Sequence, residues 1–309
     1  MRILVTGGAG FIGSSIARAY LAAGHDVAIV DDLSSGRREN LPAGAIFFQI
    51  DIRNVKLLRQ TFATIRPEVV NHHAAQLDIR RSLREPLFDV QVNVVASVTL
   101  LELCVEHGVK KVIFASSGGA IYGEPRLLPV AEGSPEAPIS HYGVAKLAVE
   151  RYLAVYSLLY GIHFTALRYA NVYGPRQNPH GEAGVVAIFI GQLLQGVTPT
   201  IFGDGTKTRD YVFVDDVVAA NLLVLDKGND EVFNIGRGVQ VSDYEIFDVI
   251  RREIDSKQEP RYAPERPGEV KHTAIDASRA KLRLGWRSKV ELADGVAKTI
   301  AHIRSCVST

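Results

Sequence analysis

Residues Ile3-Leu-Val-Thr-Gly-Gly-Ala-Gly-Phe-Ile-Gly13 decide the fold. The apolar residues at the start predict a short buried strand, and the Gly8-x-Gly10-x-x-Gly13 pattern predicts a tight turn. Phe11 to Ala23 has the apolar spacing of an amphipathic helix. Strand, glycine turn and helix in this order are typical of a unit that binds a dinucleotide. The glycines let the backbone approach a pyrophosphate, and the helix N-terminus offers it free N–H groups.

An acidic pair follows the second predicted strand, Val27 to Val30, at the position that the dinucleotide pattern requires. Asp31 can bind the adenosine ribose hydroxyls, and Asp31 with Asp32 would repel a 2′-phosphate. NAD is therefore predicted rather than NADP, although Arg37 and Arg38 weaken this preference. Farther along, Asp51 is predicted to bind the adenine amine, and a surface turn is the competing explanation for it.

Strand and helix patterns alternate through the first half of the chain, which predicts an α/β fold. Strands rich in β-branched residues separate longer helical patterns, of which Val92 to Glu106 and Tyr142 to Leu159 are the longest. We predict a Rossmann-type, doubly wound parallel sheet over residues 1–170, rejoined by about 212–236. Residues 171–309 are expected to form a smaller, partly interleaved α/β substrate domain.

The composition limits the partners that the protein can have. With 309 residues, 47% of them hydrophobic, the chain can bury a large core and form about two domains. A net charge of +1 gives no overall field for nucleic acid or an anionic membrane. Cys104 and Cys306 are too few for a disulfide framework, and the N-terminus has no signal-peptide pattern. These features predict a cytoplasmic protein that binds neither nucleic acid nor a membrane.

The segment Tyr142-Gly-Val-Ala-Lys146 carries the candidate chemistry. Lys146 follows Tyr142 by one helical turn, so both side chains lie on one face of the helix. An ammonium there favours the phenolate, and we therefore predict a lowered pKa for Tyr142. A base with a pKa near neutrality suits the oxidation of an alcohol.

Taken together, the motifs make the chain resemble the extended short-chain dehydrogenase/reductases, and specifically the group of UDP-glucose 4-epimerases. The resemblance covers the whole chain and rests on seven ordered motifs: Thr6-Gly-Gly-Ala-Gly-Phe-Ile-Gly13, Asp31-Asp-Leu-Ser-Ser-Gly36, His72-His-Ala-Ala-Gln76, Ser116-Ser-Gly-Gly-Ala-Ile-Tyr-Gly123, Tyr142-Gly-Val-Ala-Lys146, Leu167-Arg-Tyr-Ala-Asn-Val-Tyr-Gly-Pro175 and Gly203-Asp-Gly-Thr-Lys-Thr-Arg-Asp-Tyr211.

The resemblance implies three catalytic residues. Tyr142 would be the acid/base, Lys146 would tune it and hold the nicotinamide ribose, and Ser117 would hydrogen-bond the reacting sugar hydroxyl. Because Gly118-Gly119 adds one residue to the family spacing, Ser116 remains the alternative to Ser117. Related dehydratases carry acidic residues in this loop, and related decarboxylases keep a glutamate there. Since glycine has no side chain to carry a proton, the glycines argue against both of those reactions.

The same resemblance implies an NAD site and a UDP-hexose site. For NAD the matching residues are Gly7, Gly10, Phe11, Ile12, Gly13, Asp31, Asp32, Ser34, Ser35, Gly36, Asp51, Ile52, His73, Ala74, Ala75, Gln76, Asn93, Ser116, Tyr142, Lys146, Tyr169 and Val172. For the substrate they are Ser117, Tyr142, Asn171, Gly184, Val185, Phe202, Gly203, Arg209, Arg266, Glu269 and Thr273.

Some of these positions have competing explanations. A structural role within its helix is the alternative for Asn93, and packing under the cofactor is the plain explanation for His72. No metal site is predicted at His72 and His73, because adjacent strand residues point to opposite faces and no ligand follows at a suitable spacing. Thr273 stands where some family members carry a bulky tyrosine that excludes N-acetyl groups, so its small side chain would leave room for them.

The function implied by the resemblance is NAD-dependent interconversion of UDP-glucose and UDP-galactose through a 4-keto intermediate. The alternatives are a 4-epimerase of UDP-N-acetylglucosamine or UDP-glucuronate, and a catalytically silent NAD-binding sensor. The intact Ser117, Tyr142 and Lys146 set argues against the sensor. Relatives of this kind imply a homodimer, with the apolar segments Val92 to Glu106 and Tyr142 to Leu159 as the candidate interface.

Overall fold

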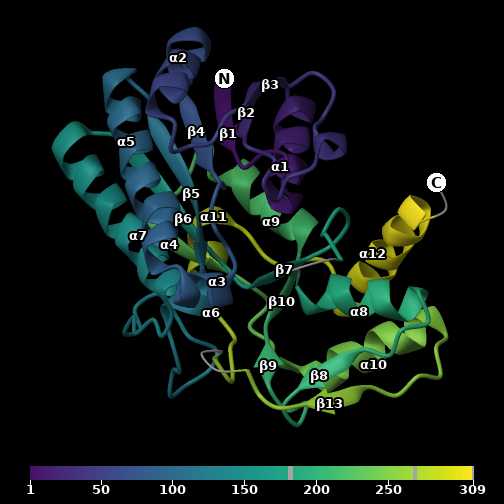
Figure 1. The fold of residues 1–309 in the computed structure, drawn as a ribbon. Helices are drawn as coiled ribbons and strands as arrows, with labels where there is room; N and C mark the ends of the chain where they lie inside the picture. The colour runs from purple at the N-terminus through teal and green to yellow at the C-terminus, as the bar shows by residue number, and fades with distance from the viewer. Residues whose placement is uncertain (180–183, 267–269, 308–309) are drawn as a thin grey trace.

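The computed structural model describes residues 1–179, 184–266 and 270–307. Its centre is a seven-stranded sheet in the order β11-β6-β5-β4-β1-β2-β3, with every neighbouring pair parallel (Figure 1). The predicted Rossmann-type α/β fold is confirmed. The strands are β1 (Arg2–Thr6), β2 (Asp26–Asp31), β3 (Ile46–Gln49), β4 (Val69–His72), β5 (Lys111–Ser117), β6 (His163–Tyr169) and β11 (Glu231–Ile235).

Helices cover both faces of this sheet because successive strand residues point to opposite sides. In β1, Ile3 and Val5 pack in a core with α1 (Phe11–Ala22), α9 (Val214–Leu223) and α11 (Ser278–Leu284). Leu4, between them, belongs to a second core with α2 (Val55–Ile65), α5 (Ala96–Glu106) and α7 (His141–Tyr160). Parallel strands covered on both faces read as continuous apolar runs, which is the pattern that the sequence shows.

The last strand of the sheet comes from the second half of the chain. After β6 the chain leaves the sheet through β7 (Asn171–Tyr173), and it returns through α9, which packs against α1. Strand β11 then pairs with β6, from Glu231 opposite Thr165 to Ile235 opposite Tyr169. Residues 231–235 lie within the range 212–236 for which the sequence predicts a return to the sheet.

A smaller unit lies beyond the carboxyl end of the sheet (Figure 1). It contains α8 (Val185–Leu194), α10 (Asp243–Ile254) and α12 (Leu292–Val307), whose buried side chains share one core. Its two-residue and three-residue strands form three small pairs: β7 with β10 (Tyr211–Phe213), β8 (Thr200–Phe202) with β13 (Arg261–Ala263), and β9 (Thr208–Arg209) with β12 (Val241–Ser242).

One apolar helical stretch is long enough to cross a membrane, among the residues described. It runs from Pro86 to Glu106 through α4 (Pro86–Val90), a π-helical turn η2 (Gln91–Val95) and α5. The buried residues of α5 pack with Val112, Phe114 and Val149 in the second core. Packing beneath the sheet explains why one side of this stretch is apolar. The short helices α3 (Ile79–Arg84) and α6 (Gly118–Ile121) complete the first half.

Candidate active site

The predicted cofactor residues gather at the carboxyl ends of the parallel strands. Gly7 follows β1, Asp31 ends β2, His73 follows β4, Ser117 ends β5 and Tyr169 ends β6. Ligands of open α/β sheets bind outside this edge, where loops rather than strands meet. Segments that are far apart in the sequence thus surround one cleft.

The glycine turn leaves no room for side chains. Gly7 has φ +69°, and a Cβ there would lie 2.6 Å from the backbone nitrogen of Ala74. A Cβ on Gly13 would lie 2.2 Å from the carbonyl oxygen of Gly7. Gly10 caps α1 without a side-chain hydrogen bond, and the first turn contains no acidic residue. The turn therefore presents backbone N–H groups and a positive helix end, which suits a pyrophosphate.

The acid after β2 supports this turn. Asp31 is buried, and its carboxylate accepts hydrogen bonds from the backbone N–H groups of Ala9 (2.9 Å) and Leu33 (2.8 Å). Burial raises the pKa of Asp31, while these two hydrogen bonds act in the opposite direction. Asp32 instead accepts from the backbone and hydroxyl of Ser34. The loop Ser34-Ser35-Gly36 packs against the glycine turn. A Cβ on Gly36 would lie 2.8 Å from Asp31 Oδ1 and 2.9 Å from the Cβ of Ala9.

Two other predicted cofactor residues have partners of their own. Asp51 forms an ion pair with Arg53 at 2.5 Å, which lowers the pKa of Asp51. The buried Asn93 accepts from the backbone N–H of Gln76 (2.9 Å) and donates to the Gln76 carbonyl oxygen and to Asp89. The geometry of Asn93 thus matches the structural role that was its competing explanation. Its place in a π-helical turn fits a position next to a functional site.

The two adjacent histidines are held separately. His72 is buried and hydrogen-bonds Thr6 (2.7 Å) and Ser97 (2.9 Å), which matches packing under the cleft. His73 stacks near Tyr169 and hydrogen-bonds its hydroxyl at 3.2 Å. Burial, together with the charge of Lys146, lowers the pKa of each histidine to about 3, so both are neutral. Within residues 1–179, 184–266 and 270–307, no group of three or more His, Cys, Asp or Glu could hold a metal ion.

Helix α7 places Tyr142 and Lys146 on one face, beside the end of β5. Ser140 caps this helix by accepting from the backbone N–H of Gly143 at 3.1 Å. Ser117 lies beside Tyr142 and acts to lower the pKa of its hydroxyl. The Lys146 ammonium donates to the carbonyl oxygen of Ala115 at 2.8 Å and lies 5.7 Å from the centre of the Tyr142 ring.

One prediction about this group is wrong. The sequence predicts a lowered pKa for Tyr142, but burial and the charge of Asp89 raise it, with the Ser117 hydrogen bond acting in the opposite direction. Burial also lowers the pKa of Lys146 to about 8, although Asp89 and Glu150 oppose this shift. The spacing of Tyr142 and Lys146 shows that they share a helix face, but not that both are removed from water.

The serine pair separates into two roles. Ser117 lines the cavity next to Tyr142. Ser116 is buried and donates to Glu150 Oε1 at 2.5 Å. Adjacent strand residues point to opposite faces, so only one of the two hydroxyls reaches the cleft. The Ser116 side chain therefore lies away from the predicted cofactor position.

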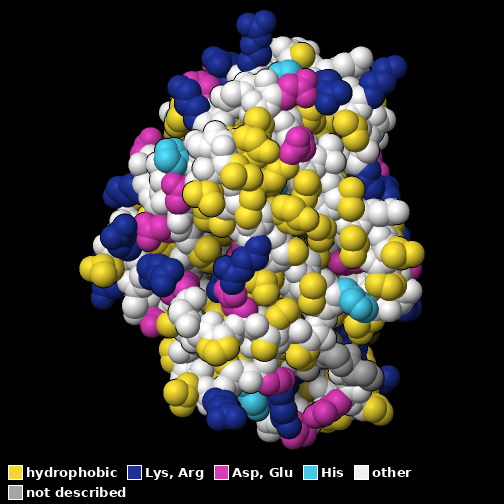
Figure 2. Space-filling model, turned by 90° about the vertical axis from the view of Figure 1, so that its left-hand side faces the viewer, with side chains coloured by type: hydrophobic (Ala, Val, Ile, Leu, Met, Phe, Trp, Pro, Cys, Tyr) yellow, Lys and Arg dark blue, Asp and Glu magenta, His cyan; other side chains and the backbone are white. Residues whose placement is uncertain are grey.

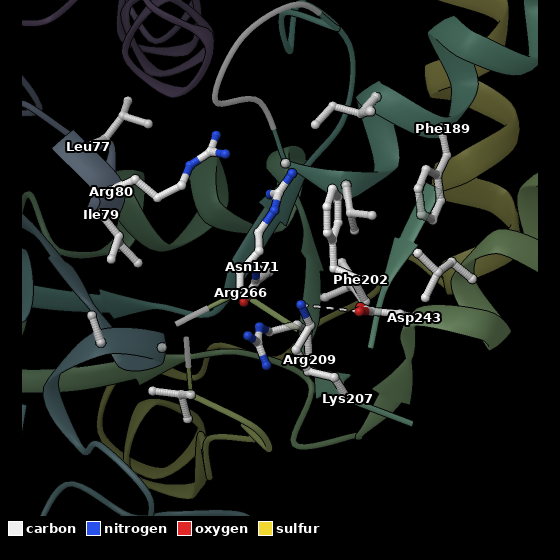
Figure 3. Close-up of a pocket in the computed structure, with 18 of the residues that line it drawn as sticks. Leu77, Ile79, Arg80, Asn171, Phe189, Phe202, Lys207, Arg209, Asp243 and Arg266 are labelled. Atoms are coloured by element: carbon white, nitrogen blue, oxygen red, sulfur yellow. Dashed lines mark ion pairs between the residues drawn. The ribbon is translucent and has the colours of Figure 1, made fainter. Parts of the chain in front are cut away.

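A cavity of about 850 Å³ opens between the sheet and the smaller unit (Figure 3). It contains Ser117 and Tyr142 at one end and Phe202 and Arg266 at the other. The predicted residues that line it are Ser117, Tyr142, Tyr169, Asn171, Gly184, Val185, Phe202, Arg209 and Arg266. Residues predicted from separate motifs thus surround a single space large enough for a small molecule.

Cations from both units face this cavity. The guanidinium carbon of Arg266 lies 3.5 Å from the centre of the Phe202 ring, so that the charged group stacks on the aromatic ring. Arg209 donates to the carbonyl oxygen of Thr208 at 2.8 Å. Figure 3 shows Arg80 extending toward the same space from the sheet side. Such a group of guanidinium ions suits a diphosphate.

The sequence analysis missed several residues of the cavity. Lys207 stands within a quoted motif and forms an ion pair with Asp243 at 3.3 Å (Figure 3). Arg80 follows the His72–Gln76 motif closely, so its position was the available signal. Four apolar residues also line the cavity, and no sequence motif pointed to them: Leu77, Ile79, Ile188 and Phe189.

Two predicted substrate residues, Gly203 and Thr273, are not among the residues that line the cavity. Gly203 has φ +92°, and a Cβ there would lie 3.0 Å from the side chain of Glu265. Thr273 is buried, and its hydroxyl has no hydrogen-bond partner among the described atoms. Glu269 lies outside the described residues.

Comparison with known proteins gives consistent similarities. Residues 3–236 match the model of the NAD dependent epimerase/dehydratase family. The chain is 46% identical over 311 residues to a UDP-glucose 4-epimerase of Mycolicibacterium smegmatis, covering 99% of both chains. It superposes with a TM-score of 0.98 on a UDP-glucose 4-epimerase of Thermotoga maritima solved with UDP-glucose, at 47% identity and covering 99% of this chain and 100% of that one. A Thermus thermophilus UDP-glucose 4-epimerase in complex with NAD gives a TM-score of 0.94 at 42% identity, and the match covers 98% of this chain and 99% of that one.

Proposed function

The chain belongs to the NAD dependent epimerase/dehydratase family, as its motifs predict, and on this basis we propose that it is a UDP-glucose 4-epimerase. It would interconvert UDP-glucose and UDP-galactose through a 4-keto sugar, with NAD retained between turnovers. The observation that carries this proposal is that Ser117 and Tyr142 line the same cavity as Arg209 and Arg266. The reacting groups and the diphosphate-binding groups thus face one bound molecule.

The cleft fits NAD. The turn from Gly7 to Gly13 would hold the pyrophosphate, since a Cβ at either end would collide with backbone. Asp31 would bind the adenosine ribose, and Lys146 the nicotinamide ribose. When bound, NAD⁺ supplies the hydride acceptor and a positive charge next to Tyr142.

Tyr142 would move the proton in each direction. It would take the proton of the sugar C4 hydroxyl while Ser117, which lines the cavity beside it, orients that hydroxyl. The bound cationic cofactor and the Lys146 ammonium both favour the phenolate, which offsets the burial that raises the pKa of Tyr142. Once the 4-keto sugar has rotated in the cavity so that its other face can be reduced, Tyr142 would return the proton to the C4 oxygen.

The loop after Ser117 limits the reaction. Gly118 and Gly119 begin α6, and Gly119 lines the cavity. A Cβ on Gly118 would lie 2.7 Å from the Ile275 side chain, so this position stays small. Elimination of water would need a proton carrier at this place, and epimerisation does not.

Residues 171–309 would provide most of the nucleotide-sugar site. Asn171, Arg209 and Arg266 would hold the diphosphate, while Phe202 and the start of α8 at Val185 would frame the nucleoside. Stacking on Phe202 holds the planar guanidinium of Arg266 in one orientation before a ligand arrives.

We further propose that two copies assemble through α7 and the π-helical turn before α5. Figure 2 shows this side of the molecule, where hydrophobic side chains gather into a broad patch. Leu158 is 83% exposed and Leu159 is 63% exposed, and Val95, Val144 and Val155 are also exposed. A contiguous apolar surface of this kind is typical of a subunit interface.

A cytoplasmic location stays a prediction.

The test is to incubate the purified protein with UDP-galactose, without added NAD, and to follow UDP-glucose by chromatography. We expect conversion to an equilibrium mixture. If UDP-galactose is unchanged while UDP-N-acetylgalactosamine or UDP-galacturonate is converted, the protein is an epimerase of another UDP-sugar. If none is converted although NAD is bound, the epimerase proposal is wrong.

A further inference from the structure

A buried ion pair lies directly behind the catalytic group and has no part in the mechanism above. Arg168 and Glu150 are almost completely buried, with side-chain exposures of 2% and 1%. Arg168 donates to Glu150 from Nε (2.9 Å) and from Nη2 (2.6 Å), so the contact is bidentate. The Ser116 hydroxyl donates to the same carboxylate. Removing two charges from water is costly, so the pair requires a reason beyond stability.

Each member of this cluster neighbours a residue of the site. Ser116 precedes Ser117 on β5, and Arg168 precedes Tyr169 on β6. The register of the two strands sets Ser116 opposite Arg168 and Ser117 opposite Tyr169. Glu150 follows Lys146 by one turn of α7, on the same face. One carboxylate therefore joins the three elements that carry Ser117, Lys146 and Tyr169.

Lys146 also requires a counter-charge. It is buried, and burial lowers its pKa to about 8. Two carboxylates oppose this shift, Glu150 from its own helix and Asp89 from α4. Of its other neighbours, His72 at the end of β4 and His73 after it are neutral, and Tyr142 is uncharged until it loses its proton. Asp89 also raises the pKa of Tyr142, whereas Glu150 is not among the groups that do so.

We propose that Glu150 is a positioning residue for the catalytic group: its carboxylate fixes α7 against β5 and β6, and it serves as the counter-charge of Lys146. Its partner Arg168 holds the carboxylate in place and also contacts Tyr122 (2.8 Å) and Glu136 (2.5 Å). The inference rests on the proposed epimerase function, because it assigns Glu150 a role in that reaction.

The test uses the NAD-bound protein without sugar. Ultraviolet difference spectra against the matching Tyr142→Phe protein follow the phenolate of Tyr142 alone as the pH is raised. Without the Glu150 charge, Lys146 loses its proton more readily and stabilises the phenolate less. For Glu150→Gln we expect the phenolate titration to move to higher pH by about one unit, and kcat for UDP-galactose to fall about tenfold with little change in KM.

Two controls separate this role from a merely structural one. Glu136→Gln removes a carboxylate from the same Arg168 guanidinium and from the exposed Arg151 of α7, but it leaves the contacts of Glu150 with Arg168 and Ser116 in place, so it should keep the wild-type titration. The double variant Glu150→Gln/Arg168→Met removes the unpaired buried charge. It should recover much of the Tm that Glu150→Gln loses, but the shifted titration should remain.

The inference is overturned if Glu150→Gln titrates like the wild type, or if the double variant restores the titration along with the Tm. Neither result depends on turnover. If the wild-type protein does not convert UDP-galactose, the proposed function is contradicted. The titration of the Tyr142 phenolate in the Glu150 variants still tests the role of Glu150 in that case.

Discussion

At the scale of single residues, Tyr142 is the group on which the proposed reaction depends. Tyr142→Phe keeps the ring and removes the proton carrier. We expect kcat to fall on the order of 10²–10⁴-fold, with bound NAD unchanged. The measurements are UDP-galactose turnover and the NAD released on denaturation. A silent NAD-binding sensor would show no measurable difference between this variant and the wild type.

The serine pair gives a matched test at the same scale. Ser117 lines the cavity with Tyr142, whereas Ser116 donates a hydrogen bond to Glu150 on the other side of the strand. We expect Ser117→Ala to lower kcat on the order of 10²-fold. Ser116→Ala should lower kcat only about tenfold. Steady-state kinetics of both variants decide the matter. A larger loss for Ser116→Ala would reverse the assignment.

The sequence could not decide between these serines. The extra glycine at Gly118-Gly119 shifts the spacing by one residue, and only the folded chain shows that Ser117 lines the cavity while Ser116 is bonded to Glu150. The pKa of Tyr142 was mispredicted for a related reason. Helical spacing places Lys146 beside it, but burial depends on residues from other elements.

At the scale of elements, the glycine turn is a site where strand and helix meet without room for a methyl group. Gly13→Ala would place a Cβ 2.2 Å from the Gly7 carbonyl oxygen. We expect it to lose most of its bound NAD and to unfold more easily by about 1–3 kcal/mol. Gly133→Ala is the control, because nothing lies within 4 Å of its Cβ. NAD content and thermal unfolding compare the two. Normal NAD content in Gly13→Ala would contradict the assigned pyrophosphate site.

Predictability from sequence differs between the two halves of the chain. Strand β2 was predicted to within one residue at each end, because buried parallel strands appear as short apolar runs between helical patterns. The strand pairs of the smaller unit have two or three residues each, too few for any periodicity to show. Lys207 and Arg80 were missed for a different reason. They come from opposite halves of the chain, and only the fold brings both to the cavity.

At the scale of the whole molecule, the apolar patch on α7 predicts the state of assembly. Leu158→Glu places a charge at an 83% exposed position and should convert a dimer to monomers without unfolding the chain. Leu282→Glu on α11 is the control, at 84% exposure and far from α7 in the sequence. Molar mass from light scattering distinguishes the two. A wild-type monomer, or a dimer that survives Leu158→Glu, would contradict this interface.

The central claim is that a hydride leaves C4 of the sugar and returns to it through NAD held by the same protein. The most direct measurement uses UDP-galactose carrying deuterium at C4, without added NAD, and locates the deuterium in the product by mass spectrometry. We predict UDP-glucose that keeps its deuterium at C4. Product that has exchanged this deuterium with solvent, or conversion that requires added NAD, would contradict the account.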